Sequence, residues 1–377
     1  MQEIKMVDLS AQHARIGKEL DEAIQNVMKA TAFIKGPDVK LFEEELAAYL
    51  GVNHVIGCAN GTDALQLALM ALELPTGSEV ITTDFTFVAT AEVVRLLGLT
   101  PVLVDIDPDT FNIDIVKLEN AITNKTKAII PVHLFGQCAD MESIMAIANK
   151  HNLFVIEDTA QAIGTEYTFA DGSKKKSGTI GHFGCTSFFP SKNLGAAGDG
   201  GAVFTNDPKL AKKITSIANH GQGDQYHYDY IGVNSRLDTL QAAILRVKLQ
   251  HLNEYNTARQ QAAAYYDQAF AGNKYLQVPQ RNPLSTHTFH QYTLRVLNGK
   301  RYELMAYLNE NKIPNKIYYP VPVHDNAPYA STCKYDLKAL KNTMKVSDEV
   351  LSLPMHTELT EEQLKYITDT VNGYFIL

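Results

Sequence analysis

Between residues 54 and 156, short apolar runs alternate with helical patterns, and few folds accommodate such an alternation. The predicted strands cover residues 54–59, 79–83, 101–105, 128–132 and 153–156. The helices predicted between them cover residues 64–72, 89–97, 117–122 and 141–151. This pattern predicts an α/β fold with a mainly parallel sheet that is covered by helices on both faces. In such sheets the ligand site lies beyond the carboxyl ends of the strands.

The rest of the 377-residue chain is long enough for a second, smaller domain. An amphipathic helix is predicted over residues 9–30, with Ser10 as its N-cap, and a long helical strut over residues 237–271. Beyond the strut, shorter strands mix with helices. We therefore predict a large domain over residues 1–250, which includes an N-terminal helical arm, and a small C-terminal α/β domain over residues 251–377.

Composition excludes several classes of partner. A net charge of −8 gives no general attraction to nucleic acids or anionic membranes, and the run Lys174–Lys176 is interpreted as a solvated hairpin tip. The four cysteines lack metal-ligand spacing, so we expect free thiols, no metal and a reducing compartment. No leader segment and no apolar run of about 18 residues are found, which predicts a soluble cytoplasmic protein.

One lysine, Lys192, stands inside a glycine-rich segment that spans residues 183–204. Apolar strand-like runs flank it at residues 187–189 and 201–204. Because an amine among apolar walls and tight turns is poorly solvated, its pKa should fall from about 10.4 towards the range of a nucleophile or base. Taken alone, the segment also fits a surface lysine between two strands.

Other polar and aromatic residues follow the predicted strands. Asp158 comes directly after Phe154–Glu157, and because side chains alternate along a strand, only one of Glu157 and Asp158 should face the site. Asp158 also fits an ordinary helix N-cap. The turn before residue 64 places Gly61 at a helix start, a position that favours phosphate, although an ordinary capped turn has the same pattern. Phe87 follows another strand, either as part of the core or as a plate for a flat ligand.

Together these groups match the needs of pyridoxal 5′-phosphate. Lys192 is expected to form the Schiff base, and Asp158 is expected to bind the protonated pyridine nitrogen, which lets the ring accept electrons. The helix start with its Thr62 hydroxyl, together with a serine, would hold the phosphate, and an aromatic ring would stack on the pyridine. A dinucleotide-binding dehydrogenase would need a Gly-x-Gly-x-x-Gly turn, which residues 60–63 do not supply.

The motifs resemble those of the DegT-type sugar aminotransferases over nearly the whole chain. They are Asn60–Leu65, Phe85–Thr90, Glu157–Gln161, Phe188–Lys192 and Gly232–Arg236. The resemblance implies a fold of the aspartate-aminotransferase type (pyridoxal-phosphate fold type I) and a homodimer with shared active sites. A branch of the family that performs dehydration lacks the lysine, and Lys192 argues against that branch.

The resemblance also implies roles for single residues. Lys192 matches the Schiff-base lysine, Asp158 the partner of the pyridine nitrogen, and Gln161 the residue near O3′ of the cofactor ring. Phe87 matches the stacking aromatic. The remaining matches are phosphate ligands: Gly61, Thr62, Ser187 and, from the other subunit, Asn234.

Within the family the likeness is greatest to UDP-2-acetamido-2-deoxy-3-oxo-glucuronate aminotransferases. The shared sequence motifs are Cys58–Asp63, Leu134–Asp140, Gly184–Phe189 and Arg236–Gln241. In those enzymes an arginine at the Arg236 position and a His-Tyr pair contact the sugar, and here Tyr318 and Tyr319 stand in the place of the pair. Arg236 offers a fork for a uronate carboxylate.

The reaction implied by this likeness is amination of a UDP-linked 3-keto sugar by L-glutamate, for cell-surface polysaccharide (O-antigen or lipopolysaccharide) synthesis. Within the same class, a TDP-linked 3-keto-6-deoxyhexose or a 4-keto nucleotide sugar is an alternative substrate. From a different class, the chain is alternatively a cofactor-binding regulator without turnover.

Overall fold

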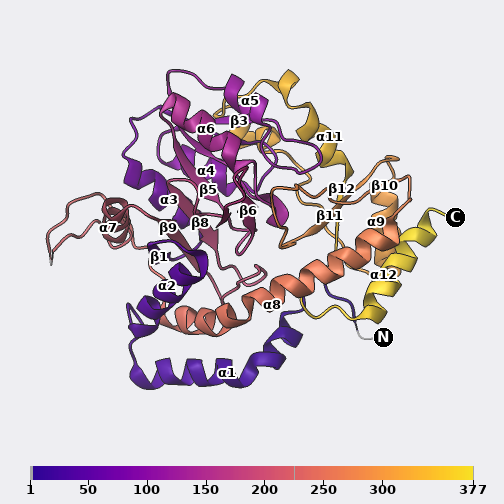
Figure 1. Ribbon diagram of the computed structural model, residues 1–377, viewed down its shortest axis with the longest axis horizontal. Helices are drawn as coiled ribbons and strands as arrows, with labels where there is room; N and C mark the ends of the chain where they lie inside the picture. The colour runs from indigo at the N-terminus through magenta and orange to yellow at the C-terminus, as the bar shows by residue number, and fades with distance from the viewer. Residues whose placement is uncertain (1–2, 225, 377) are drawn as a thin grey trace.

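A computed structural model describes residues 3–224 and 226–376 and contains two main sheets linked by one long helix (Figure 1). The larger sheet has seven strands. In spatial order they are β1 (His54–Cys58), β9 (Gly201–Thr205), β8 (Phe183–Ser187), β5 (Phe154–Asp158), β4 (Thr126–Ile130), β2 (Glu79–Thr83) and β3 (Thr100–Val104).

Strands β8, β5, β4, β2 and β3 pair in parallel, whereas β9 runs antiparallel to both β8 and β1. The carboxyl ends of β1, β8, β5, β4 and β2 therefore lie at one edge of the sheet. This confirms the predicted α/β fold with a mainly parallel sheet. The antiparallel direction of β9 was not predicted, because an apolar run does not indicate in which direction its strand runs.

Helices cover both faces of the large sheet. Consecutive strand residues belong to different hydrophobic clusters, as for Val80 and Ile81 or Val155 and Ile156, which is the alternation that two covered faces require. The helices packed on one face are α3 (Gly61–Leu72), α4 (Ala89–Leu96) and α7 (Pro208–Ile217). Those on the other face are α2 (Pro37–Leu50), α5 (Ile115–Asn120), α6 (Met141–His151) and α8 (Thr239–Phe270).

The second core lies around the three-stranded antiparallel sheet. Its strands are β10 (Leu276–Gln277), β11 (Tyr292–Val296) and β12 (Val350–Leu353). The remaining helices of the C-terminal part are α9 (Arg301–Glu310), α10 (Ala327–Ala330), α11 (Lys341–Glu349) and α12 (Glu361–Tyr374), with short 3-10 turns at Val323–Asp325 and Leu337–Ala339. A further 3-10 turn, Leu134–Gly136, follows β4 of the large sheet.

Helix α8 belongs to both cores. Leu245 and Leu252 pack with α2 beside the large sheet, whereas Tyr266 and Phe270 pack in the second core. The helix is continuous through residue 250, so a domain boundary at that residue stays a prediction. At the other end of the chain, α1 (Leu9–Ala30) runs alongside α8 (Figure 1).

Two local features lie a few residues from their predicted positions. Asp8, not Ser10, caps α1, because the Asp8 carboxylate accepts the backbone N–H of Ala11 at 3.1 Å. The lysines of residues 174–176 form strand β7, paired with β6 (Glu166–Thr168), and the hairpin tip lies at residues 169–173.

Across residues 3–224 and 226–376, no helix combines the length and the apolar character that crossing a bilayer requires.

Candidate active site

Lys192 lies in a tight loop between β8 and β9. The backbone N–H of Lys192 donates to the Phe189 carbonyl at 2.8 Å, and that of Ala196 donates to the Phe188 carbonyl at 2.7 Å. Gly195 is required here, because a Cβ at this position would lie 2.3 Å from the Pro190 carbonyl oxygen. The lysine is therefore held at the carboxyl end of β8 by a closely packed backbone.

The two acidic residues that end β5 have separate surroundings, as strand alternation predicts. The buried Glu157 carboxylate accepts the backbone N–H groups of Gly178, Ile180 and Gly181, all within 2.9 Å. The Asp158 carboxylate accepts the backbone N–H of Ala160 through Oδ1 at 3.1 Å. No described residue bonds Asp158 Oδ2. Glu157 is thus satisfied within the fold, and Asp158 keeps one oxygen for a ligand.

Lys192 and Asp158 act on each other electrostatically. Burial lowers the pKa of the Lys192 amine to about 8, against an opposing effect of the Asp158 carboxylate. Burial raises the pKa of Asp158, whereas the Ala160 N–H, Lys192 and His133 act to lower it. A neutral amine is thus accessible near neutral pH beside a carboxyl group that lies in a poorly solvated position.

The start of α3 meets the end of β8 and forms a cradle. Asn60 caps α3, and its side chain accepts the Asp63 N–H at 2.8 Å. The N–H groups of Gly61 and Thr62 have no intrahelical partner, because they lie in the first turn. Gly61 lies against Ser187, so close that a Cβ at residue 61 would be 2.6 Å from the Ser187 Cβ. These donors at a positive helix end suit a phosphate group.

Replacing Gly61 by alanine should narrow this cradle. The added Cβ overpacks the contact between α3 and Ser187, which costs typically about 1–3 kcal/mol. We expect the affinity for pyridoxal phosphate to fall roughly 5- to 150-fold in a titration of the apoprotein. Gly17→Ala is the matched control, since nothing lies within 4 Å of a Cβ at residue 17. An unchanged affinity in Gly61→Ala would contradict this view of the cradle.

Gln161, Tyr319 and Phe87 lie close together. Gln161 Nε2 donates to the Tyr319 hydroxyl at 3.0 Å, and the Tyr319 ring lies 6.3 Å from the Phe87 ring. Phe87 is 56% exposed, whereas its neighbour Phe85 is fully buried. Phe85 is therefore the core aromatic of this segment, and the exposed Phe87 ring stays available as a plate for a flat ligand.

Asn234 and Arg236 lie on a segment next to the cradle. The intervening Ser235 accepts the Ala59 N–H at 3.2 Å, which ties this segment to the end of β1. Arg236 donates to the Asn219 side chain at 3.4 Å, and the Asn234 side chain is exposed. Tyr318, the other predicted sugar contact, packs against Tyr319 with ring centroids 6.0 Å apart.

Sequence reasoning missed two residues that support the site. His133, at the end of the predicted strand 128–132, donates to Glu157 through Nε2 at 2.9 Å, because its Nδ1 accepts the Ala139 N–H. His133 directly follows a predicted strand, as Asp158 does, so the same criterion would have indicated His133. Asn193, beside Lys192, donates to Asn256 and to the Thr288 carbonyl, and no sequence signal links those positions.

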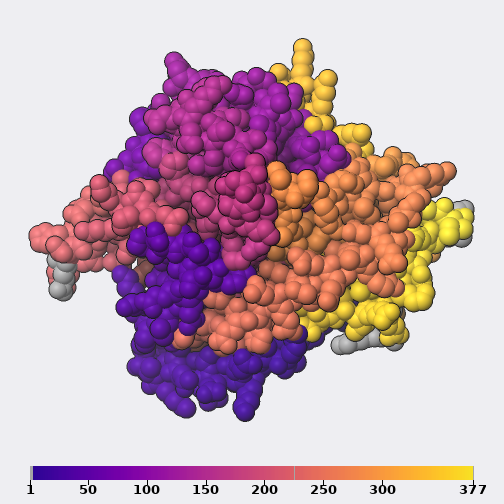
Figure 2. Space-filling model, viewed as in Figure 1, coloured from indigo at the N-terminus to yellow at the C-terminus, as the bar shows by residue number. Residues whose placement is uncertain are grey.

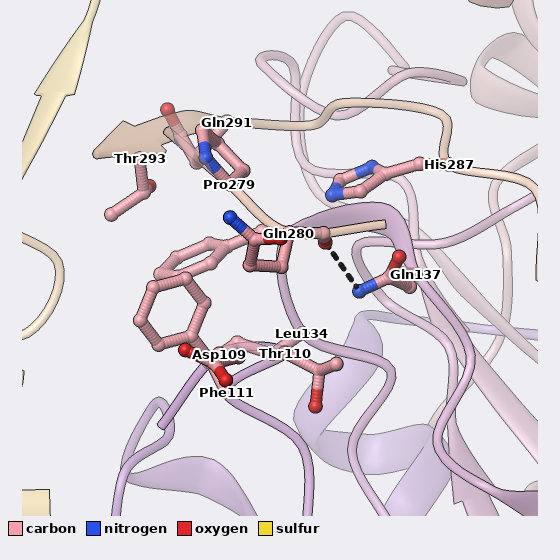
Figure 3. Close-up of a pocket in the computed structure, with 11 residues that line it drawn as sticks. Asp109, Thr110, Phe111, Leu134, Gln137, Pro279, Gln280, His287, Gln291 and Thr293 are labelled. Atoms are coloured by element: carbon pink, nitrogen blue, oxygen red, sulfur yellow. Dashed lines mark hydrogen bonds between the residues drawn. The ribbon is translucent and has the colours of Figure 1, made fainter. Parts of the chain in front are cut away.

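A narrow hollow beside this region is not a ligand site. It lies between the loop at residues 109–111 and the segment that leads into β11, and Gln137 bridges its wall by donating to the Gln280 carbonyl (Figure 3). Its interior leaves no room even for a water-sized molecule.

The observed groups fit pyridoxal phosphate. A poorly solvated amine, a carboxylate with a free oxygen and a helix-start cradle stand at one sheet edge, and an exposed aromatic ring lies beside them. On such a sheet they define the class of pyridoxal-phosphate-dependent enzymes.

Comparison with known proteins makes the assignment specific. The chain belongs to the DegT/DnrJ/EryC1/StrS aminotransferase family, whose model matches residues 14–372. It is an aminotransferase that uses pyridoxal phosphate.

Three curated relatives match over nearly the full length. The chain is 47% identical to UDP-2-acetamido-2-deoxy-3-oxo-D-glucuronate aminotransferase of Pseudomonas aeruginosa, over 97% of this chain and 98% of that one. It is 45% identical to UDP-N-acetyl-3-dehydro-alpha-D-glucosamine 3-aminotransferase of Acidithiobacillus ferrooxidans, over 98% and 97%. It is 46% identical to a protein of Geobacillus stearothermophilus named pleiotropic regulatory protein, over 99% and 98%.

Solved structures agree with the fold. The structure of S. venezuelae DesV in complex with a ketimine intermediate matches with a TM-score of 0.94 at 37% identity, over 99% of both chains. The structure of ntda from Bacillus subtilis with bound cofactor PMP matches with a TM-score of 0.87 at 32% identity, over 99% of this chain and 83% of that one. The predicted aspartate-aminotransferase type of fold is thereby confirmed.

Proposed function

We propose that the protein transfers the amino group of L-glutamate to C3 of UDP-2-acetamido-2-deoxy-3-oxo-glucuronate, which yields the 3-amino sugar and 2-oxoglutarate. The observation that carries the transamination chemistry is the placement of the buried Lys192 amine and the buried Asp158 carboxyl group at one sheet edge, where they act on each other electrostatically. The identity of 47% to an enzyme named for this substrate supports the choice of sugar.

When bound, pyridoxal phosphate supplies an aldehyde that takes up amino groups and a ring that accepts electrons. Lys192 would anchor that aldehyde and, once the amino donor has displaced it, would move a proton from the donor α-carbon to C4′ of the cofactor. Its lowered pKa keeps a usable fraction of the amine neutral. In the second half-reaction Lys192 would move the proton in the opposite direction, so that the amine is left on the sugar.

The other residues bind and orient. Asp158 Oδ2 would accept the pyridine N–H in a charge-assisted bond worth roughly 1.5–3 kcal/mol. Phe87 would stack on the ring and Gln161 would face O3′. The remaining ligands would hold the phosphate, namely Gly61, Thr62, Ser187 and the partner subunit's Asn234.

Arg236, Tyr318 and Tyr319 are proposed to bind the sugar. The Arg236 guanidinium is partly buried, and among the described residues its one hydrogen bond is the 3.4 Å contact with Asn219, so the fork can turn to a carboxylate. A uronate carries such a group at C6, and a 6-deoxy sugar does not.

Arg236→Lys should therefore discriminate between substrates. Because an ammonium cannot replace a bidentate fork, we expect kcat/KM on the 3-oxo-uronate to fall roughly 10-fold further than on a neutral 3-keto-6-deoxy sugar. Arg246→Lys is the control, since Arg246 pairs with Glu45 and Asp38. Equal losses on both sugars would remove the carboxylate role from Arg236.

A regulatory role is the second candidate, because the Geobacillus stearothermophilus relative is named a pleiotropic regulatory protein. A panel of nucleotide keto-sugars distinguishes the two. The protein is first loaded as pyridoxamine phosphate, and return of the aldehyde form is followed in the visible spectrum. In a regulator without turnover, no sugar restores the aldehyde form. In an enzyme for a TDP-3-keto-6-deoxyhexose or a 4-keto sugar, those sugars restore it. In the proposed enzyme, the UDP-3-oxo-uronate restores it.

The assembly that we propose is a homodimer with shared sites. The segment after α7 projects from the large-sheet part of the molecule (Figures 1 and 2). Its side chains Tyr226 and Ile231 are 77% and 90% exposed, and the exposed Asn234 follows them. Exposed apolar groups of this kind suit burial against a second copy. The free, mostly buried cysteines support a cytoplasmic location, where cell-surface polysaccharide precursors would be made.

A further inference from the structure

A buried pair fixes the loop that carries Tyr318 and Tyr319. His324 lies at the far end of this loop, and its Nδ1 donates to Asp84 Oδ2 at 2.6 Å. The backbone N–H of His324 donates to Asp84 Oδ1 at 2.9 Å, and that of Val323 donates to the Asp84 carbonyl at 3.1 Å. Asp84 has no exposed surface and His324 is 5% exposed.

Asp84 joins this loop to the carboxyl end of β2. It directly follows the strand, and its own N–H donates to the Val104 carbonyl of β3 at 3.0 Å. The next residue, Phe85, packs its ring 6.0 Å from the ring of Tyr319. Both ends of the loop therefore contact the same segment, residues 84–85 at the carboxyl end of β2.

The covalent chain between the two ends is short and stiff. Only residues 320–323 separate Tyr319 from His324, and Pro320 and Pro322 are two of them. Because proline fixes φ, few backbone angles remain free over this distance. A displacement of His324 is therefore transmitted to Tyr319.

The Tyr319 hydroxyl has a defined hydrogen-bond direction. Gln161 Oε1 accepts the backbone N–H of Phe135 at 2.8 Å, which orients the amide so that Nε2 faces Tyr319 and donates to its hydroxyl. The hydroxyl accepts there, so its own O–H is free to donate. A donor at this place suits an oxygen of the sugar.

We propose that Asp84 and His324 are positioning residues that keep the Tyr319 hydroxyl hydrogen-bonded to Gln161. They thereby orient the O–H of Tyr319 towards the nucleotide sugar. Neither side chain can touch the substrate from its buried place, so both act through the loop. The proposal rests on the proposed function for the identity of the sugar, but the geometry of Tyr319 is independent of it.

The variants are His324→Ala, which removes the bond to Asp84, and His324→Asn, whose Nδ2 can occupy the place of Nδ1. We expect His324→Ala to lower kcat/KM for the sugar roughly 10- to 100-fold, since it leaves a buried carboxylate without its partner. His324→Asn should recover most of the loss. The affinity for pyridoxal phosphate should change less than about threefold in both, because the ring and phosphate contacts are untouched.

A double-mutant cycle with Tyr319→Phe separates positioning from general destabilisation. If His324 acts through the Tyr319 hydroxyl, His324→Ala should cost little further activity in the Tyr319→Phe background. The control is His182→Ala, because His182 accepts the Val155 N–H at 3.0 Å at the opposite, amino-terminal edge of β8. That variant should show the same small effect in both backgrounds.

Crystal structures of the two His324 variants provide a test that needs no substrate. The hydrogen bond from Gln161 Nε2 to the Tyr319 hydroxyl is 3.0 Å long in the wild-type protein. It should be kept in His324→Asn and broken in His324→Ala. An intact contact in His324→Ala, or equal fold losses in both backgrounds of the cycle, overturns the proposal. Failure of every sugar to react with the wild-type protein would instead contradict the proposed function, and the crystallographic arm would still decide the role of His324.

Discussion

Replacing Lys192 by alanine should abolish transamination. The variant loses the anchor of the cofactor and the base at once, and the base alone is typically worth about 10²–10⁴-fold in kcat. The visible absorption band that reports the lysine-bound cofactor should disappear as well. Steady-state assays with L-glutamate and the keto-sugar, together with spectra after addition of pyridoxal phosphate, measure both effects.

Lys248 provides the matched control for a buried amine. Burial lowers the pKa of Lys248 to about 8, as for Lys192, yet Lys248 donates to the Gly195 carbonyl at 2.8 Å and lies on α8 behind the loop. Lys248→Met should keep the visible band and lose mainly stability. If Lys192→Ala kept both the band and turnover, the assignment of Lys192 would be wrong.

Replacing Asp158 by asparagine should have the second largest effect. An amide cannot hold the pyridine nitrogen protonated, so the ring becomes a poor electron acceptor while the cofactor stays bound. The lost charge-assisted bond, roughly 1.5–3 kcal/mol, predicts a fall in kcat of roughly 10- to 150-fold at unchanged protein stability. Stability should not fall, because burial already raises the pKa of Asp158 and so disfavours its charge.

Glu157→Gln is the matched control on the adjacent residue. Glu157 binds His133 and three backbone N–H groups of residues 178–181, so its loss should lower Tm. The pair of variants thus separates a carboxylate that stabilises the fold from one that serves the cofactor. A fall in Tm in Asp158→Asn with undiminished kcat would reverse these assignments.

The sequence indicated the positions of Lys192, Asp158 and Gly61 because strand ends in an alternating α/β chain meet at one edge. The alternation of side chains along a strand predicted that Glu157 and Asp158 face opposite ways, and in the structure the two carboxylates bind different partners. These predictions depend on local pattern and on the period of a strand, both of which are visible in a single sequence.

Long-range contacts could not be predicted in this way. Asp84 and His324 are separated by 240 residues, and Gln161 and Tyr319 by 158, so no local pattern joins them. The cap of α1 was misplaced by two residues because Asp8 and Ser10 are both good caps, and only the three-dimensional structure shows which one bonds a backbone N–H.

The cofactor should join the chain at residue 192. Borohydride reduction of the cofactor-loaded wild-type protein, followed by peptide mass spectrometry, locates that bond directly. A pyridoxyl group is expected on the peptide that contains Lys192. A group found on Lys248 instead, or no labelled peptide from a protein saturated with pyridoxal phosphate, would contradict it.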